Sequence, residues 1–114
     1  YVIITGGAND VFWRESIPAI LDNYRQMVNL AEKDNIKVII GLTPPIDDPE
    51  MEVRLKRLRS ELVNLAGEKQ RTVIDFSPPF YRTDGSVESS LFLDGAHPNR
   101  EGYQLMGKCL PPNI

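Results

Sequence analysis

The chain has 114 residues, 41% of them hydrophobic and 25% charged, which is the composition of an ordinary folded domain and a length for one domain at most. Its net charge of −3 gives no broad positive field, so neither nucleic acid nor an anionic membrane surface is expected as a partner. The longest unbroken apolar runs, such as Val38 to Ile40, are far too short to span a bilayer.

Three apolar segments rich in β-branched residues predict strands. They are Val2 to Thr5, Val38 to Leu42 and Thr72 to Phe76. None shows the polar alternation of a strand with one wet face, so each is expected to be a buried strand of a parallel sheet.

Helical spacing of apolar residues predicts a helix after each of the first two strands and another near the end of the chain. The first is expected to be capped by Ser16 and to end near Asp34-Asn35, and the second begins at Asp48-Pro49. Asn99 is expected to cap the last helix, whose predicted inner face consists of Tyr103, Met106 and Leu110.

This order of elements predicts an α/β fold, in which right-handed crossovers join parallel strands and helices cover the sheet. A long loop from Ser77 to Leu93 separates the last strand from the last helix, and loops of that length in compact domains are often functional. Ligands of open parallel sheets bind beyond the carboxyl ends of the strands, so the chemistry is sought there.

The first polar block at such an end is Gly6-Gly7-Ala8-Asn9-Asp10, directly after the first strand. Its glycines permit a sharp turn, and the Asn9 amide could project over the sheet edge, where its N–H could stabilise an oxyanion. The alternative is an ordinary turn, because Gly-Gly and Asn-Asp are common turn and cap residues.

The second block is Asp94-Gly95-Ala96-His97-Pro98, just before the last helix, and it contains the only histidine of the chain. Pro98 disfavours a helical backbone at His97, and Asp94 can accept a hydrogen bond from the ring Nδ1–H, which leaves Nε2 free to act as a base. Here too a plain surface turn is the alternative, since Asp-Gly is a frequent turn dipeptide.

Other candidate sites are weaker. The chain has neither a set of residues at metal-ligand spacing nor a phosphate-binding glycine loop, so no metal and no cofactor are expected. Cys109 falls on an apolar helix face and is expected to be a structural thiol. A basic helix segment is expected to be a solvated face: Arg54, Lys56, Arg57 and Arg59. Five aromatic residues either line an acyl pocket or belong to the core or its rim: Phe12, Trp13, Phe80, Tyr81 and Phe92.

Together, the two blocks resemble those of the SGNH (GDSL-like) hydrolase family. Gly7-Ala8-Asn9-Asp10 matches the family's Gly-x-Asn-Asp block. Asp94 to Asn99 matches its Asp-x-x-His-Pro block, and Glu101-Gly102-Tyr103 continues it in the family manner. The blocks occur in the family's order, separated by two strand-helix units, and the resemblance covers nearly the whole chain.

The resemblance implies a flavodoxin-like three-layer α/β/α fold with a parallel sheet, of which residues 1–114 form the C-terminal part of a single domain without its first two strands. It also implies ester hydrolysis through a covalent serine intermediate. His97 would be the general base, Asp94 would orient the imidazole ring, and Asn9 would donate to the oxyanion. Gly7 would shape the turn.

The family's Gly-Asp-Ser block and the glycine block that completes the oxyanion hole are not in this sequence. In the family both precede the asparagine block, and Ser86 follows Asp84-Gly85 in a different order, so the nucleophilic serine is expected upstream of Tyr1. Residues 1–114 alone are therefore expected to be inactive. The apolar edge of the first strand is expected to associate with the missing N-terminal segment or with a second copy of the chain.

The leading functional prediction is a serine ester hydrolase of the lipase, acylhydrolase or esterase type, with a small-molecule acyl ester as its substrate. Two alternatives stay open: a carbohydrate O-acetylesterase of the same family, and a non-catalytic α/β module that binds a partner, if the chain is complete as given. The sequence does not establish the compartment, although the lack of a disulfide framework favours the cytoplasm.

Overall fold

Three parallel strands form one sheet in chain order, β1 (Val2–Thr5), β2 (Val38–Leu42) and β3 (Thr72–Asp75). The computed structural model describes residues 1–68 and 70–112 and pairs Val2 with Val38 and Ile39 with Thr72. The three predicted strands and the α/β class are therefore confirmed, with β3 ending one residue before Phe76.

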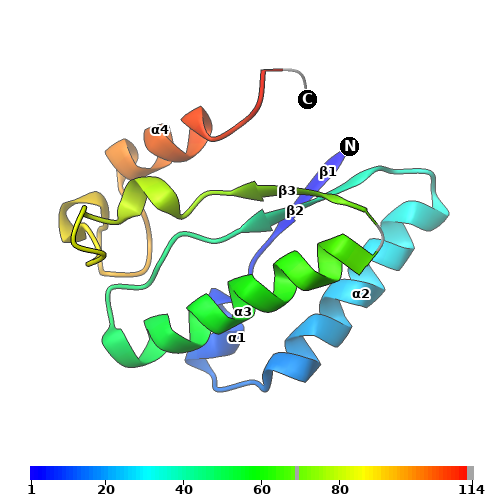
Figure 1. Cartoon of the computed structure of the whole chain (residues 1–114), viewed down its shortest axis with the longest axis horizontal. Helices are drawn as coiled ribbons and strands as arrows, with labels where there is room; N and C mark the ends of the chain where they lie inside the picture. The colour runs from blue at the N-terminus through cyan, green and yellow to red at the C-terminus, as the bar shows by residue number, and fades with distance from the viewer. Residues whose placement is uncertain (69, 113–114) are drawn as a thin grey trace.

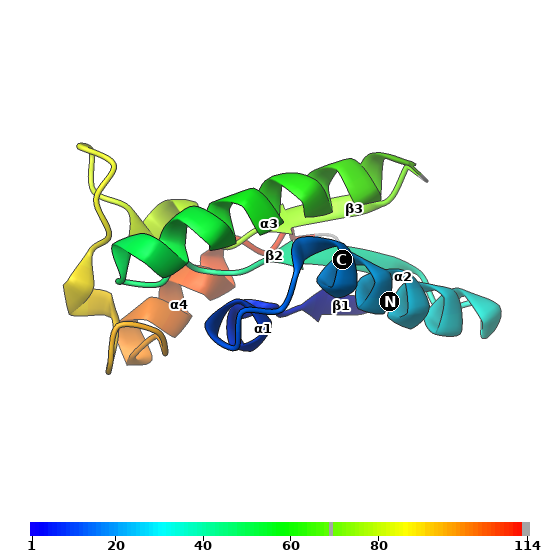
Figure 2. The same ribbon diagram turned by 90° about the horizontal axis from the view of Figure 1, so that it is seen from below.

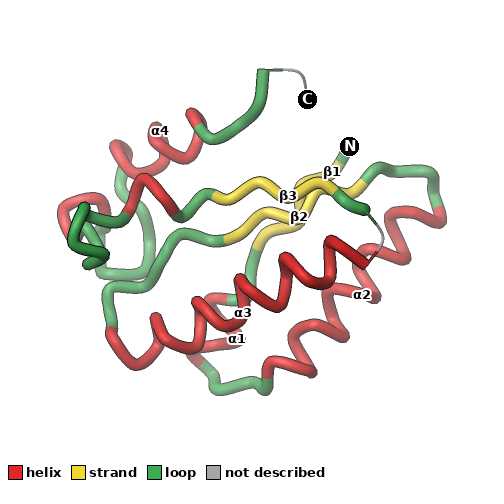
Figure 3. The backbone as a smooth tube through the Cα atoms, in the orientation of Figure 1, coloured by secondary structure: helices red, strands yellow, loops and turns green. Residues whose placement is uncertain are grey.

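The sheet is the middle of three layers (Figures 1 and 3). Val38, Ile40 and Leu42 of β2 pack into a core with α2 (Ile17–Lys33) and α3 (Pro49–Glu68), which lie on the same face of the sheet (Figure 2). Ile39 faces the other way, toward α4 (Arg100–Lys108). Because both faces of β2 are covered, all five of its residues are buried, which explains its unbroken apolar sequence.

The two long helices begin at the predicted caps. Ser16 accepts a hydrogen bond from the Ala19 N–H at 3.2 Å, and Asp48 accepts one from the Met51 N–H at 3.1 Å. Each helix has one buried apolar stripe, formed by Ile20, Leu21, Tyr24 and Val28 in α2 and by Leu55, Leu58, Leu62 and Leu65 in α3. The helix and cap predictions for this part of the chain are confirmed.

The predicted inner face of α4 is largely wrong. Met106 packs against the core, but the side chains of Tyr103 and Leu110 remain 57% and 44% exposed. The helix instead makes its closest approach at Gly102, where an added Cβ would lie 2.7 Å from the Leu91 carbonyl oxygen. A glycine that permits such an approach sets the contact face of the helix, and hydrophobic spacing does not detect it.

The long loop after β3 contains regular local structure. It contains two short 3-10 helices, η1 (Pro78–Phe80) and η2 (Ser89–Leu91), and Tyr81 bridges to Val87. Phe80, which is fully buried, and Phe92 form a second core with Leu91. These two aromatic side chains are therefore core residues rather than walls of a ligand pocket.

A short helix that the sequence did not predict, α1 (Ala8–Phe12), follows β1. β1 lies at one edge of the three-stranded sheet, as expected, and its association with another segment or copy stays a prediction. Within the described ranges 1–68 and 70–112, no helix is long and apolar enough to cross a membrane.

Candidate active site

The segments that follow the three strands converge on one cleft of about 870 Å³. The segment after β1 contributes residues 6–10 with Phe12 and Trp13, the β2–α3 connection contributes Ile46, α3 contributes Met51, and the segment after β3 contributes Asp94, Ala96 and His97. All four residues singled out from the sequence, Gly7, Asn9, Asp94 and His97, line this cleft. The structure thus brings together two blocks that are more than 80 residues apart in the chain.

The turn into α1 depends on Gly7. Its φ of 105° lies in the region that favours glycine, and a Cβ there would lie 2.5 Å from Cδ2 of the buried Leu58. The neighbouring Gly6 carbonyl accepts a hydrogen bond from the Tyr24 hydroxyl at 3.1 Å, and burial raises the pKa of that phenol to about 12. This part of the cleft wall is therefore fixed to both α2 and α3.

Asn9 lies in the first turn of α1 with its side chain exposed to the cleft. Within residues 1–68 and 70–112 its amide has no hydrogen-bond partner, so its N–H groups are available to a ligand. The far end of α1 is held by Arg54, which donates to the carbonyl oxygens of Val11 at 3.1 Å and Glu15 at 3.0 Å. Arg54 is thus half-buried and braces α1 against α3, rather than belonging to a solvated basic face.

Asp94 and His97 form a hydrogen-bonded pair. The carboxylate Oδ2 lies 2.7 Å from His97 Nδ1, while Oδ1 accepts from the backbone N–H groups of Ala96 at 3.0 Å and His97 at 2.7 Å. The block therefore forms a surface turn, which was the alternative interpretation of its sequence, and the Asp94 carboxylate that closes this turn also binds the His97 ring. One carboxyl group fixes both the backbone and the ring.

The protonation state of the pair follows from its contacts. Hydrogen bonds from the backbone of His97 and Ala96, together with that from the His97 ring, lower the pKa of Asp94 from its usual 3.8 to about 2. At neutral pH the carboxylate is ionised and can only accept, so the proton of a neutral ring lies on Nδ1. In that tautomer Nε2 carries the ring's free lone pair and can accept a proton or a hydrogen bond.

Neighbouring backbone keeps this turn in place. The Leu93 N–H donates to the His97 carbonyl at 2.8 Å, and Phe92 pairs with Pro98 in an antiparallel bridge, which holds the ends of the turn together. Asn99 then caps α4 as predicted, accepting from the Gly102 N–H at 3.0 Å.

The remaining cleft wall is apolar and partly aromatic. Phe12 and Trp13 pack edge to face with ring centroids 5.3 Å apart, and they remain 54% and 74% exposed. Sequence reasoning considered these two but missed Ile46 and Met51, which line the same cleft from the β2–α3 connection and from α3. The position of Ile46 just beyond the carboxyl end of β2 is the signal that could have identified it.

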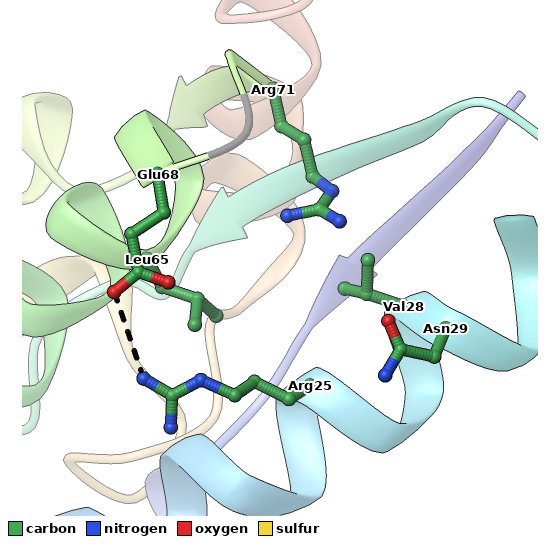
Figure 4. A pocket seen from close by; sticks show the side chains of 6 residues that line it. All are labelled: Arg25, Val28, Asn29, Leu65, Glu68 and Arg71. Atoms are coloured by element: carbon green, nitrogen blue, oxygen red, sulfur yellow. Dashed lines mark ion pairs between the residues drawn. The ribbon is translucent and has the colours of Figure 1, made fainter.

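A smaller hollow of about 100 Å³ lies between α2 and α3 (Figure 4). It contains the surface ion pair of Arg25 and Glu68 at 3.8 Å and adjoins Arg71, which precedes β3 at the amino end of the sheet. It is therefore separate from the cleft. No group of three or more metal-ligating side chains occurs in the part of the chain that the structure describes.

Residues 1–105 match the GDSL-like Lipase/Acylhydrolase family. Similar solved structures include one described as a lipolytic protein of the G-D-S-L family from Desulfitobacterium hafniense, with 28% identity over 95% of this chain and 61% of that chain at a TM-score of 0.82. A member of the same lipolytic family from Veillonella parvula is 26% identical over 94% and 58% of the two chains, with a TM-score of 0.82.

A GDSL-like lipase from Bacteroides thetaiotaomicron has 22% identity over 95% and 58% of the two chains and a TM-score of 0.84, which supports the fold. No curated protein matches the sequence. The chain spans only 61%, 58% and 58% of the lengths of these three solved structures.

Proposed function

Since the chain belongs to the GDSL-like lipase/acylhydrolase family, we propose that the whole protein is a serine ester hydrolase whose active site includes this cleft. The observation that carries the proposal is the convergence of three groups on one cleft: the exposed amide of Asn9, the ionised Asp94, and the imidazole of His97 that is hydrogen-bonded to it. These are the parts that acyl transfer requires besides a nucleophile.

In the proposed reaction, His97 Nε2 takes the proton of a serine hydroxyl as the serine oxygen bonds to the ester carbonyl carbon. The carbonyl oxygen becomes an oxyanion that accepts from the Asn9 side-chain N–H. The imidazolium, held by Asp94, then gives its proton to the departing alcohol, and water releases the acid from the acyl-enzyme by the same steps. No serine lines the cleft among the described residues, and we place the nucleophile upstream of Tyr1.

The apolar wall supports an acyl ester of small or medium chain length as the substrate. Phe12, Trp13, Ile46 and Met51 offer apolar surface beside Asn9 and no positive charge. Burial of an acyl chain there contributes about 0.8 kcal/mol for each methylene removed from water.

One observation favours a second candidate, a carbohydrate O-acetylesterase. Trp13 leaves 74% of its surface exposed at the cleft, and a flat aromatic face can pack against the C–H groups of a sugar ring. A non-catalytic partner-binding module remains the third possibility, with the β1 edge as its contact surface.

The test is hydrolysis of short p-nitrophenyl esters by the full-length protein. His97→Ala should abolish turnover, and Asn9→Ala should lower kcat by about 10²- to 10³-fold, because one oxyanion donor is lost. Asn29→Ala, an exposed asparagine of α2 beside the smaller hollow, is the matched control and should change nothing.

Asp94→Asn should also lower kcat, whereas Asp84→Asn should not, although Asp84 makes a similar turn by accepting from the Ser86 N–H at 2.9 Å. Acetate release from acetylated sugars with little activity on longer acyl chains would favour the O-acetylesterase. Full activity in His97→Ala would refute the hydrolase mechanism itself.

A further inference from the structure

A buried charged cluster joins α3 to the loop after β3. Glu52 and Arg59 lie seven residues apart on one face of α3, each retains only 7% exposure, and Arg59 Nη2 lies 3.3 Å from Glu52 Oε2. The Tyr81 hydroxyl accepts from Arg59 and donates to Glu52. Burial and the hydrogen bond to Glu52 raise the pKa of this phenol, so the hydroxyl stays protonated as the donor. Arg59 was expected on a solvated face, and that expectation is wrong.

The cluster holds the connection between β2 and α3 at two points. Arg59 Nη1 donates to the Thr43 carbonyl oxygen at 3.3 Å, and Glu52 Oε1 accepts from the Ile46 N–H at 3.3 Å. Between these anchors lie Pro44 and Pro45, whose rings restrict the backbone and which offer no N–H of their own. Two buried charge-assisted hydrogen bonds therefore fix a short, stiff segment.

The same segment contacts the Asp-His turn. The Asp47 N–H donates to the Gly95 carbonyl oxygen at 2.7 Å, and the buried Ile46 side chain forms part of the cleft wall. Gly95 lies between Asp94 and His97 with a φ of 85°, so the hydrogen bond reaches the middle of the turn. Two hydrogen bonds therefore connect the cluster to the turn, one from the Ile46 N–H to Glu52 and one from the Asp47 N–H to the Gly95 carbonyl oxygen.

We propose that Glu52, Arg59 and Tyr81 are positioning residues, which hold the Asp94–His97 turn in its working geometry through the 43–48 segment. The inference rests on the proposed function, because it assigns a role relative to that site. A buried ion pair is in general a weak source of stability, since removal of two charges from water offsets most of their attraction. Its effect on geometry is therefore the property to measure.

The test uses the full-length protein with Tyr81→Phe, which removes a single hydroxyl, and Glu52→Gln. The control is Arg71→Met, which removes another arginine with little side-chain exposure, ion-paired with Glu32 at 2.7 Å. Arg71 lines the smaller hollow (Figure 4). In both cluster variants the Asp47 amide should exchange with solvent about tenfold faster relative to a β2 amide, and kcat should fall about 10- to 100-fold with KM within about twofold. In Arg71→Met, kcat and the exchange rate of the Asp47 amide relative to the β2 amide should both stay unchanged.

A double-mutant comparison with Asp94→Ala separates positioning from general damage. Tyr81→Phe should cost little further kcat once Asp94 is gone, because the group whose geometry it supports is absent. The proposal is overturned if the fold-losses in kcat of the two single variants multiply in the double variant. It is also overturned if the exchange rate of the Asp47 amide changes only as much as that of the β2 amide. If the wild-type protein hydrolyses no ester, the proposed function fails, while the exchange ratio still decides whether the cluster holds the turn.

Discussion

Substituting Gly7 by alanine tests how tightly the turn into α1 is built. The backbone there has φ of 105°, and the new Cβ would lie 2.5 Å from Cδ2 of Leu58, which is fully buried between α3 and the sheet. Leu58 belongs to the main core with Ile20 and Leu55, so rotation of its side chain would displace packed neighbours. Relief would therefore require movement of α1, and of Asn9 with it.

The expected cost has two parts. A residue with a side chain in such a backbone region is strained by about 1–3 kcal/mol, and overpacking of a filled core costs about another 1–3 kcal/mol. Their sum of about 2–6 kcal/mol is a large share of the roughly 5–15 kcal/mol by which domains are stable. Gly7→Ala should therefore sharply lower the free energy of unfolding.

Denaturant unfolding of the full-length protein measures this difference, with Gly67→Ala as the control. Gly67 lies in α3, is exposed, and has no atom within 4 Å of an added Cβ, so alanine should raise stability there by about 0.5–1 kcal/mol. A Gly7→Ala loss below about 1 kcal/mol would refute the reasoning, because it would mean that the turn relaxes without cost.

Three further predictions concern single groups. Thr43→Val should raise the free energy of unfolding by about 1 kcal/mol in denaturant titrations, because the buried Thr43 Oγ1 has no hydrogen-bond partner among the described residues, and a loss would contradict this. Gly102→Ala should lower Tm, since the new Cβ would lie 2.7 Å from the Leu91 carbonyl oxygen, and an unchanged Tm would show that α4 moves freely. The folded-state pKa of Asp94, about 2, lies below its usual 3.8, so its ionised form stabilises the fold above about pH 4, and this contribution is lost as pH falls toward 2. Asp94→Asn should flatten the decline of unfolding free energy in that window, and an equally steep decline would contradict the cited hydrogen bonds.

The parts of the fold that sequence predicted are those set by local interactions. Ser16 and Asp48 each cap a helix through a backbone N–H three residues later, so the cap and the apolar stripe that follows it appear in one short stretch of sequence. β2 was predictable for a related reason, because a strand covered on both faces must be apolar throughout. Such signals do not depend on distant parts of the chain.

The candidate site was predictable as far as strand ends and short motifs define it. Asp94 and His97 are three residues apart, so their pairing is a local matter, and the rule for parallel sheets places Asn9 at the same edge. Ile46 had one signal in the sequence, its position just beyond the carboxyl end of β2, whereas the place of Met51 in the cleft depends on how the β2–α3 connection folds over the sheet.

The misreading of Arg59 shows where pattern reasoning fails in physical terms. Charged residues on a helix are usually solvated, and the flanking glutamates made that interpretation natural for the whole basic segment. Burial of Arg59 requires a counter-charge from Glu52, seven residues earlier on the same helix, and a hydroxyl from Tyr81. Tyr81 lies outside α3, in the loop after β3. A glutamate and an arginine at that spacing lie on the same helix face, so the pair was visible in the sequence, but the tyrosine that completes it was not.

The arrangement also explains how an exposed pair can be held accurately. The side chains of His97 and Asp94 are 71% and 55% exposed, so the core does not pack around them. Their geometry instead depends on backbone hydrogen bonds from the turn itself and from the Asp47 N–H, and the neighbouring Ile46 N–H donates to the buried Glu52 of α3. The proposed base must be exposed to meet its substrate, and in the proposed positioning role the buried groups of α3 and Tyr81 supply the rigidity that it needs, so stability and turnover should respond differently to their loss.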